Sequence, residues 1–228
     1  HILEHNYLVE NSSGQLELAG IVIGISLNSV YHFRVEDEQG RYNFYSVTLD
    51  PAEVEEAGRA AAAEIVSRLR TDAREQGHIQ DVPITVALFL EQDRESVIPG
   101  NFIAKATAEP NRPLERWQRI NERYYLFPST LATHEQRNDA ERFMKLKEEV
   151  GGFFDNYVGV VGKGFYRDEQ LQELTIEVPI RYYGKTEIVA LSQFIADRIT
   201  QRFPNNLQIQ VYITSTGGKE SVIIRNPN

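Results

Sequence analysis

The order strand, strand, helix, strand is expected twice along the chain, and this repeated order constrains the fold more than any other feature. In the first copy, β-branched and aromatic residues predict a long strand or a kinked pair of strands at 18–35 and further strands at 42–49 and 82–90. A helix is expected at 52–70. In the second copy, the expected elements are the strands "YVGVVGKGFYR" and "LTIEVPIRYY", a helix that ends before Pro204 and a strand at 207–214. Single helices between strands predict an α+β fold of two ββαβ-like halves, each with its helix packed on a mostly antiparallel sheet.

The first expected helix has a well-marked start. Asp50 suits the N-cap, Pro51 the first helical position, and Glu53 the third position of a capping box. Apolar residues then recur at helical spacing and predict the face that packs on the sheet. The predicted face consists of Val54, Ala57, Ala61, Ile65 and Leu69.

Short matches between the two copies indicate an internal repeat. A shift of 125 positions places Ile84, Val86 and Leu88 over Ile209, Val211 and Ile213, and places "RESVI" (94–98) over "KESVI" (219–223). The turn sequence "DEQ" occurs at 37–39 and again at 168–170. The face of the second helix also resembles that of the first, with Ile188, Leu191, Ile195, Ile199 and Phe203. Matches in the same order favour duplication over generic α+β patterning.

The repeat sets the expected boundaries of the chain's parts. The first half covers residues 1–98 and the second half covers residues 155–228. Residues 99–154 between them contain several prolines and one helical stretch. This segment is therefore expected to be an irregular and helical connection.

The composition excludes several classes of function. A net charge of −9 argues against nucleic-acid binding, because neutralising phosphates needs a basic surface. The same charge disfavours direct adsorption to anionic lipid. The chain has no cysteine, which excludes disulfides, thiol catalysis and cysteine metal sites. No apolar run approaches the roughly 18 residues needed to span a bilayer.

Two glycine-rich stretches resemble nucleotide-binding loops only superficially. "TSTGGKES" (214–221) lacks the spacing of a phosphate loop, and the residues after it are strand-like rather than helical. Gly217 and Gly218 are better explained as the turn of a hairpin between two strands. "GVVGKG" (159–164) precedes no helix, so its glycines indicate a bulge or close packing within a strand. Neither stretch predicts a cofactor.

Candidate catalytic residues are few. The five histidines, at positions 1, 5, 32, 78 and 134, are scattered and do not predict a metal site. No serine has the G-x-S-x-G context of a nucleophile elbow. The carboxylates Glu91, Asp93 and Glu95 follow a buried strand, and paired carboxylates are the groups that hydrolyse glycosides. The alternative for these three residues is a solvated loop.

Interleaved arginine and aromatic residues mark residues 116–127. Trp117 is the single tryptophan of the chain, and Tyr124 and Tyr125 follow it closely. Such side chains suit the recognition of sugars or peptides, so these three residues are the candidate ligand groove. Core packing of a connecting segment is the favoured alternative.

An ordered set of segments resembles the C-terminal domain of the CamS family, the sex-pheromone-precursor lipoproteins of Gram-positive bacteria. The segments are "LAGIVIGISLNSVYHF", "DVPITVALF", "YYLFPS", "GGFFDNYVGVVGKGFY", "YYGKTEIVALSQFI" and "QVYITSTGGKES". The resemblance covers nearly the whole chain, but none of these segments is a catalytic signature.

The resemblance implies a location and a general role. Family members are tethered outside the membrane through a lipidated N-terminal cysteine, and in some of them a fragment of the signal peptide is the pheromone. It therefore implies an extracytoplasmic globular domain whose only membrane link is a lipid anchor outside this chain. We expect a binding or structural module without catalysis, with a peptide or a cell-wall component as its ligand. The alternative is a cell-wall or carbohydrate hydrolase that uses the loop carboxylates.

Overall fold

A computed structural model describes residues 2–72, 79–153, 159–181 and 184–227. The chain divides into two compact units, His1–Asn121 and Glu122–Asn228. This division falls inside the segment 99–154 that was predicted to be a connection. Strand β6 (Gly100–Ala108) belongs to the first unit, whereas α2 (Thr130–Glu135) and α3 (Arg137–Phe153) belong to the second. The strand escaped prediction because alanines, which have low strand propensity, occupy its buried face.

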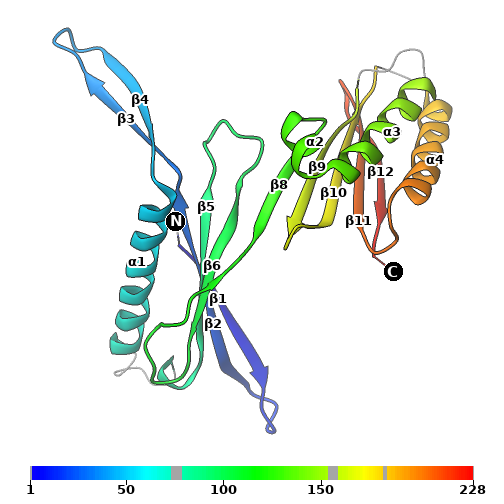
Figure 1. Cartoon of the computed structure of the whole chain (residues 1–228). Coiled ribbons are helices and arrows are strands. Elements are labelled where there is room, and N and C mark those ends of the chain that lie inside the picture. The colour runs from blue at the N-terminus through cyan, green and yellow to red at the C-terminus, as the bar shows by residue number, and fades with distance from the viewer. Residues whose placement is uncertain (1, 73–78, 154–158, 182–183, 228) are drawn as a thin grey trace. The chain divides into compact units, whose positions relative to one another are not determined.

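The first unit is a five-stranded sheet with one long helix and a separate hairpin (Figure 1). Its other elements are β1 (Ile2–Glu10), β2 (Leu16–Asn28), β3 (Val30–Glu36), β4 (Tyr42–Thr48), α1 (Pro51–Asp72), a 3-10 turn at Ile79–Asp81, β5 (Ile84–Glu91) and β7 (Gln118–Arg119). The strand order is β1-β2-β5-β6-β7, with β2 and β5 parallel and the remaining pairs antiparallel. Among the described residues, strands β3 and β4 pair with each other and with no other strand, and form a two-stranded ribbon.

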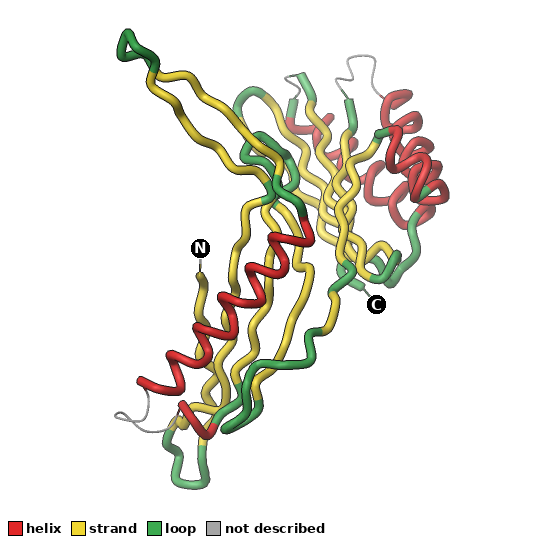
Figure 2. The backbone as a smooth tube through the Cα atoms, turned by 60° about the vertical axis from the view of Figure 1, so that its left-hand side comes forward, coloured by secondary structure: helices red, strands yellow, loops and turns green. Residues whose placement is uncertain are grey.

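Helix α1 lies along one face of this sheet (Figure 2). Its predicted start is confirmed, because the Asp50 carboxylate accepts from the Ala52 N–H at 2.8 Å. In the middle of the helix, the residues that face the sheet come one position later in the sequence than predicted. Gly58 and Ala62 are buried there, whereas Ala57 and Ala61 are exposed. Alanines give little contrast between the faces of a helix. Which face is buried depends on Leu27 of β2, whose side chain packs against Gly58.

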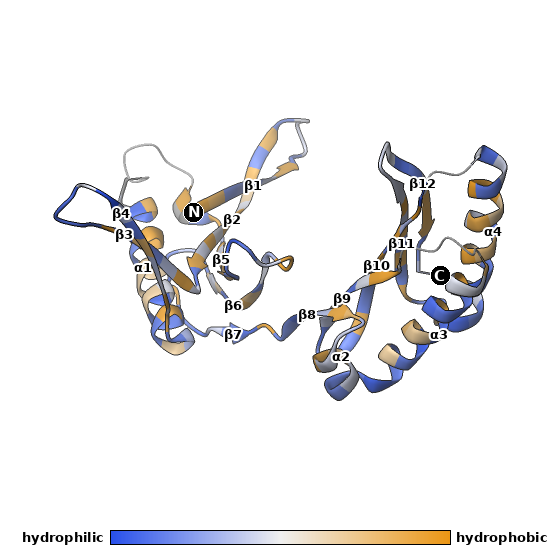
Figure 3. Ribbon diagram, turned by 90° about the horizontal axis from the view of Figure 1, so that it is seen from above, coloured by the Kyte–Doolittle hydropathy of each residue, from blue (hydrophilic) through white to orange (hydrophobic). Residues whose placement is uncertain are grey.

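The second unit is a five-stranded sheet with helices packed on one face. Its elements are β8 (Glu122–Phe127), α2, α3, β9 (Val161–Arg167), β10 (Gln170–Pro179), α4 (Lys185–Arg202), β11 (Gln208–Ser215) and β12 (Gly218–Arg225). The strand order is β12-β11-β10-β9-β8, with β10 and β11 parallel. Hydrophobic and hydrophilic residues alternate along α4 (Figure 3), and Leu191, Ile195 and Ile199 are buried as predicted.

Two predictions about glycines are confirmed in this unit. "TSTGGKES" forms the β11–β12 hairpin, although Thr216 and Gly217 make the turn and Gly218, at φ +125°, begins β12. In β9, Gly162 and Gly164 allow close packing. A Cβ atom on Gly162 would lie 2.5 Å from Phe143 Cε2, inside the core.

The two units share a strand–helix–strand core. In each, a helix connects two adjacent parallel strands, β2–α1–β5 in the first unit and β10–α4–β11 in the second. The aligned strand β5 is the middle strand of its sheet, whereas β11 is next to the edge strand β12. The matched residues at 84, 86, 88 and 209, 211, 213 are nevertheless all buried. This common topology fits the predicted repeat, and its origin by duplication stays a prediction.

Some of the sequence matches do not correspond in space. "RESVI" lies in the loop between β5 and β6, whereas "KESVI" lies in strand β12. The two "DEQ" turns join β3 to β4 and β9 to β10, which hold different places in their units. These short matches therefore carry no structural equivalence.

Candidate functional site

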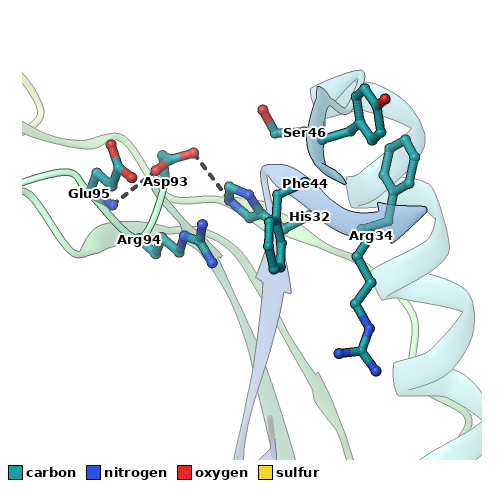
Figure 4. Close-up of a pocket in the computed structure, with 9 residues that line it drawn as sticks. His32, Arg34, Phe44, Ser46, Asp93, Arg94 and Glu95 are labelled. Carbon is teal, nitrogen blue, oxygen red and sulfur yellow. Dashed lines mark hydrogen bonds and ion pairs between the residues drawn. The ribbon is translucent and has the colours of Figure 1, made fainter. Parts of the chain in front are cut away.

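A hollow of about 440 Å³ lies between the β3–β4 ribbon and the β5–β6 loop of the first unit (Figure 4). We call it the hairpin pocket. Its lining residues are His32, Phe33, Arg34, Phe44, Tyr45, Ser46, Asp93, Arg94 and Glu95. The lining therefore includes two arginines and two acidic residues beside aromatic residues of the ribbon.

The register of the ribbon places the ribbon side chains of the pocket. His32 lies opposite Ser46, and Arg34 lies opposite Phe44. The side chains of such directly opposed pairs lie on the same face of an antiparallel ribbon. The turn that sets this register is fixed by Asp37, whose Oδ1 accepts from the Arg41 and Gln39 N–H groups at 2.9 Å each. The hydrogen bond from the Arg41 backbone is the main reason that the pKa of Asp37 is lowered.

A contact between His32 and Asp93 joins the ribbon to the loop. His32 Nε2 lies 3.3 Å from Asp93 Oδ2. The nitrogen is buried, and within the described residues it makes no hydrogen bond of regular geometry. The other carboxylate oxygen of Asp93 accepts from the Glu95 N–H at 2.9 Å, which holds the loop in a turn. Asp93 is therefore committed to holding the pocket together.

The charged side chains of Arg94 and Glu95 remain available to bind a ligand. Across the described part of the chain, neither side chain makes a hydrogen bond or an ion pair with protein. Both side chains are exposed and leave the same loop. The Arg94 side chain extends toward the ribbon, whereas the Glu95 carboxylate points away from it (Figure 4). Arg34 differs, because its guanidinium lies 4.5 Å from the centre of the Tyr42 ring.

Exposed aromatic side chains cover both faces of the ribbon. Phe44, on the pocket face, is 75% exposed. On the opposite face, Phe33 stacks on Tyr45 with ring centres 5.5 Å apart and on Tyr31 at 5.7 Å. Large exposed apolar side chains on an isolated ribbon are typical of an interaction surface.

The three predicted carboxylates do not act as one group. Asp93 and Glu95 line the pocket, whereas Glu91 does not, and its carboxylate accepts a hydrogen bond from the Ser26 hydroxyl. Ser46 lies opposite His32, but within the described residues the Nε2 atom of the ring has no hydrogen bond to the Ser46 hydroxyl. Over the same residues, no three or more acidic or histidine side chains are placed to hold a metal ion. His1 and His78 lie outside the described residues.

The predicted aromatic groove is not assembled within either unit. Trp117 belongs to the first unit, where it packs against the core and lies 5.4 Å below the Arg59 guanidinium. Tyr124 and Tyr125 belong to β8 of the second unit. As neighbours in a strand they point to opposite faces, so Tyr125 is 3% exposed in the core while Tyr124 packs on Phe165.

The two tyrosines have surroundings typical of packed residues. The Tyr125 hydroxyl donates to Glu135 at 2.6 Å and accepts from Arg123 at 3.1 Å. Burial raises the pKa of Tyr124, with smaller contributions from Glu122 and Glu173. The favoured alternative of core packing therefore describes Tyr125. Apart from Asp93 and Glu95, the pocket is lined by residues that sequence reasoning did not select. The available signal for them was the excess of aromatic residues in "VYHFRV" and "YNFYSV".

A family model described as "CamS sex pheromone cAM373 precursor" matches residues 1–228. No curated protein matches the chain. No helix of the described residues has the length and apolar character required to cross a membrane.

Solved structures support the same relationship. A sex pheromone precursor from Lactobacillus salivarius is similar with a TM-score of 0.86 and 28% identity. The C-terminal domain of the sex pheromone staph-cAM373 precursor from Staphylococcus aureus is similar with a TM-score of 0.80 and 28% identity. Each match covers 100% of this chain and 65% of the other, so the chain spans about two thirds of these relatives' length.

Proposed function

This chain belongs to the CamS family, and from that premise we propose that it is the extracytoplasmic domain of a membrane-anchored lipoprotein that acts by binding a ligand. The observation that carries this proposal is the hairpin pocket. It combines an exposed aromatic side chain, Phe44, with two charged side chains, Arg94 and Glu95, that have no protein partner among the described residues. The ligand classes that suit such a site are peptides and cell-wall components.

The contacts of the pocket carboxylates favour binding over hydrolysis. A glycoside hydrolase needs two carboxylates facing the same bond, one as acid and the other as base or nucleophile. Within the pocket, Asp93 contacts His32 and its own loop, which leaves Glu95 as the carboxylate without a partner. This arrangement supports recognition by charge and shape.

A thermal-shift screen with short peptides and peptidoglycan fragments tests the proposal. We expect at least one ligand to raise the melting temperature, because a ligand that binds only the folded state stabilises it. Phe44→Ala should abolish this rise and leave the melting temperature of the free protein unchanged, since the side chain is 75% exposed. Val97→Ala is the matched control, because Val97 is 72% exposed in the adjacent loop and does not line the pocket. Absence of any shift, or an equal shift in the Phe44 variant, would sink the proposal.

A further inference from the structure

We propose that the hairpin pocket binds short peptides through their C-terminal carboxylate, with Arg94 as the anion-binding residue. This inference rests on the proposed binding function and specifies its ligand class. It is carried by the pairing of an unpartnered arginine with an unpartnered acidic residue beside an exposed aromatic ring.

Arg94 is the group that selects an anion. A guanidinium presents two parallel N–H donors to a carboxylate, and this bidentate geometry adds specificity as well as energy. Arg34 is placed against Tyr42, so Arg94 is the pocket arginine with no ring or ion partner among the described residues. A neutral sugar would leave this charge without a counterpart.

The acidic residues beside Arg94 limit the charge that the anion can carry. Asp93 and Glu95 flank Arg94 in the chain and also line the pocket. A phosphate group with nearly two negative charges would be repelled by both carboxylates. A carboxylate carries a single charge and matches the single free arginine.

The remaining groups fit the rest of a peptide chain. Glu95 has no protein partner in the described residues and accepts hydrogen bonds, which peptide N–H groups supply. Phe44, opposite Arg34 on the ribbon, offers apolar contact to the last side chain of the peptide. The volume of about 440 Å³ lies within the range of about 300–1,000 Å³ that is typical of small-ligand sites.

The experiment compares one peptide in two forms. The probes are N-acetyl-alanyl-alanyl-phenylalanine with a free carboxylate and the same peptide as its C-terminal amide. Titrations of the whole ¹⁵N-labelled chain, followed by amide and arginine Nε–H signals, measure both affinities. We expect the acid to bind at least tenfold more tightly than the amide and to shift the signals of Arg94 and of the ribbon.

Two variants assign the effect to one side chain. Arg94→Gln should weaken binding of the acid at least tenfold and bring it close to the amide. Arg112→Gln is the matched control, because Arg112 is an exposed loop arginine of the same unit outside the pocket, and it should change the affinity less than twofold. Equal affinities for acid and amide, or normal binding by the Arg94 variant, would overturn the inference. So would inorganic phosphate that shifts Arg94 at lower concentration than the acid.

A neutral disaccharide separates this inference from the binding function beneath it. N,N′-diacetylchitobiose is titrated under the same conditions. If it shifts the ribbon signals and neither peptide does, the carboxylate assignment is wrong and the binding function stands. If no probe shifts any signal of the pocket, both proposals fail.

Discussion

The guanidinium of Arg225, near the end of β12, donates to the carbonyl oxygen of Phe203 at the end of α4, across 3.2 Å. The same side chain donates to the carbonyls of Ile199, Pro204 and Leu207. The last carbonyls of a helix have few partners within the helix, and this arginine adds a charged donor where α4 ends. The Ile199 and Pro204 carbonyls also accept from the Phe203 and Leu207 N–H groups. Desolvation at this place lowers the pKa of Arg225.

Arg225→Met should therefore destabilise the protein by about 2–3 kcal/mol, because several partly buried carbonyls lose a charged donor. Urea unfolding followed by circular dichroism measures the change. Arg137→Met is the control, since Arg137 makes an exposed ion pair with Glu141 at 2.9 Å, and loss of such a pair costs about 0–1 kcal/mol. Equal effects of the two substitutions would contradict the role given to Arg225.

The first unit satisfies a similar cluster of carbonyls with a different element. Arg70, in the last turn of α1, donates to the carbonyls of Ala108 at 3.1 Å and Glu109 at 2.9 Å. Arg70 and Arg225 are not related by the shift of 125 positions that aligns β5 with β11. The two units thus meet the same requirement with residues that do not correspond, which weakens any argument for duplication from individual polar contacts.

Substitution of Gly162 tests the close packing in the second unit. An added Cβ atom would lie 2.5 Å from Phe143 Cε2, and Phe143 is enclosed by the core and stacked on Phe127. Gly162→Ala should destabilise the protein by about 1–3 kcal/mol through overpacking. Gly152→Ala has nothing within 4 Å of the new atom and lies in α3, so it should stabilise the protein by about 0.5–1 kcal/mol. We expect the melting temperature to fall in the Gly162 variant and to rise in the Gly152 variant. Two shifts of the same sign would disprove this account.

The predictable parts of the fold are those in which apolar and polar residues differ clearly between the buried and exposed positions of an element. Helix α4 alternates isoleucine and leucine with charged residues, so its buried face could be read directly. Helix α1 contains a run of alanines, and its face depends on which position Leu27 of β2 packs against. That information lies in tertiary contacts rather than in the helix sequence.

The candidate site was less predictable because it joins distant segments. Asp93 and Glu95 were identified as candidate carboxylates, but Arg94 between them was not selected. Arg94 lines the pocket because the β3–β4 ribbon leaves the sheet beside its loop. No local sequence pattern predicts the direction of the ribbon. Tyr124 and Tyr125 do not share a face for a local reason, since they are adjacent in a strand and point to opposite sides.

The ion pair between Glu149 and Arg202 should make stability depend on pH. The hydrogen bond that Arg202 donates to the Glu149 carboxylate is the main cause of the lowered pKa of Glu149. A carboxyl whose pKa is lower in the folded state stabilises the protein above its unfolded pKa of about 4.5. This stabilisation is lost as the pH falls through the lower folded-state value.

Glu149→Gln should consequently lower the melting temperature at pH 7 and lower it less at pH 3. Melting curves of both proteins at intervals between these values measure the difference. Glu148→Gln is the control, since Glu148 is exposed on the same helix and makes no ion pair within the described residues. A deficit in the Glu149 variant that persists unchanged at pH 3 would exclude the ion pair as its cause.

The contact between His32 and Asp93 should limit opening of the β3–β4 ribbon. A two-stranded ribbon is at best marginally stable alone, so its attachment to the β5–β6 loop matters. Asp93→Asn removes the charge that faces His32 Nε2 at 3.3 Å and retains an oxygen for the Glu95 N–H. A partly exposed polar contact of this kind contributes at most about 1 kcal/mol, so amide exchange in residues 30–48 should rise about two- to fivefold. Exchange in α4 should not change, and Glu95→Gln should leave the ribbon unaffected. Ribbon exchange that is the same in the Asp93 variant and the parent protein would show that the ribbon is held by its other contacts.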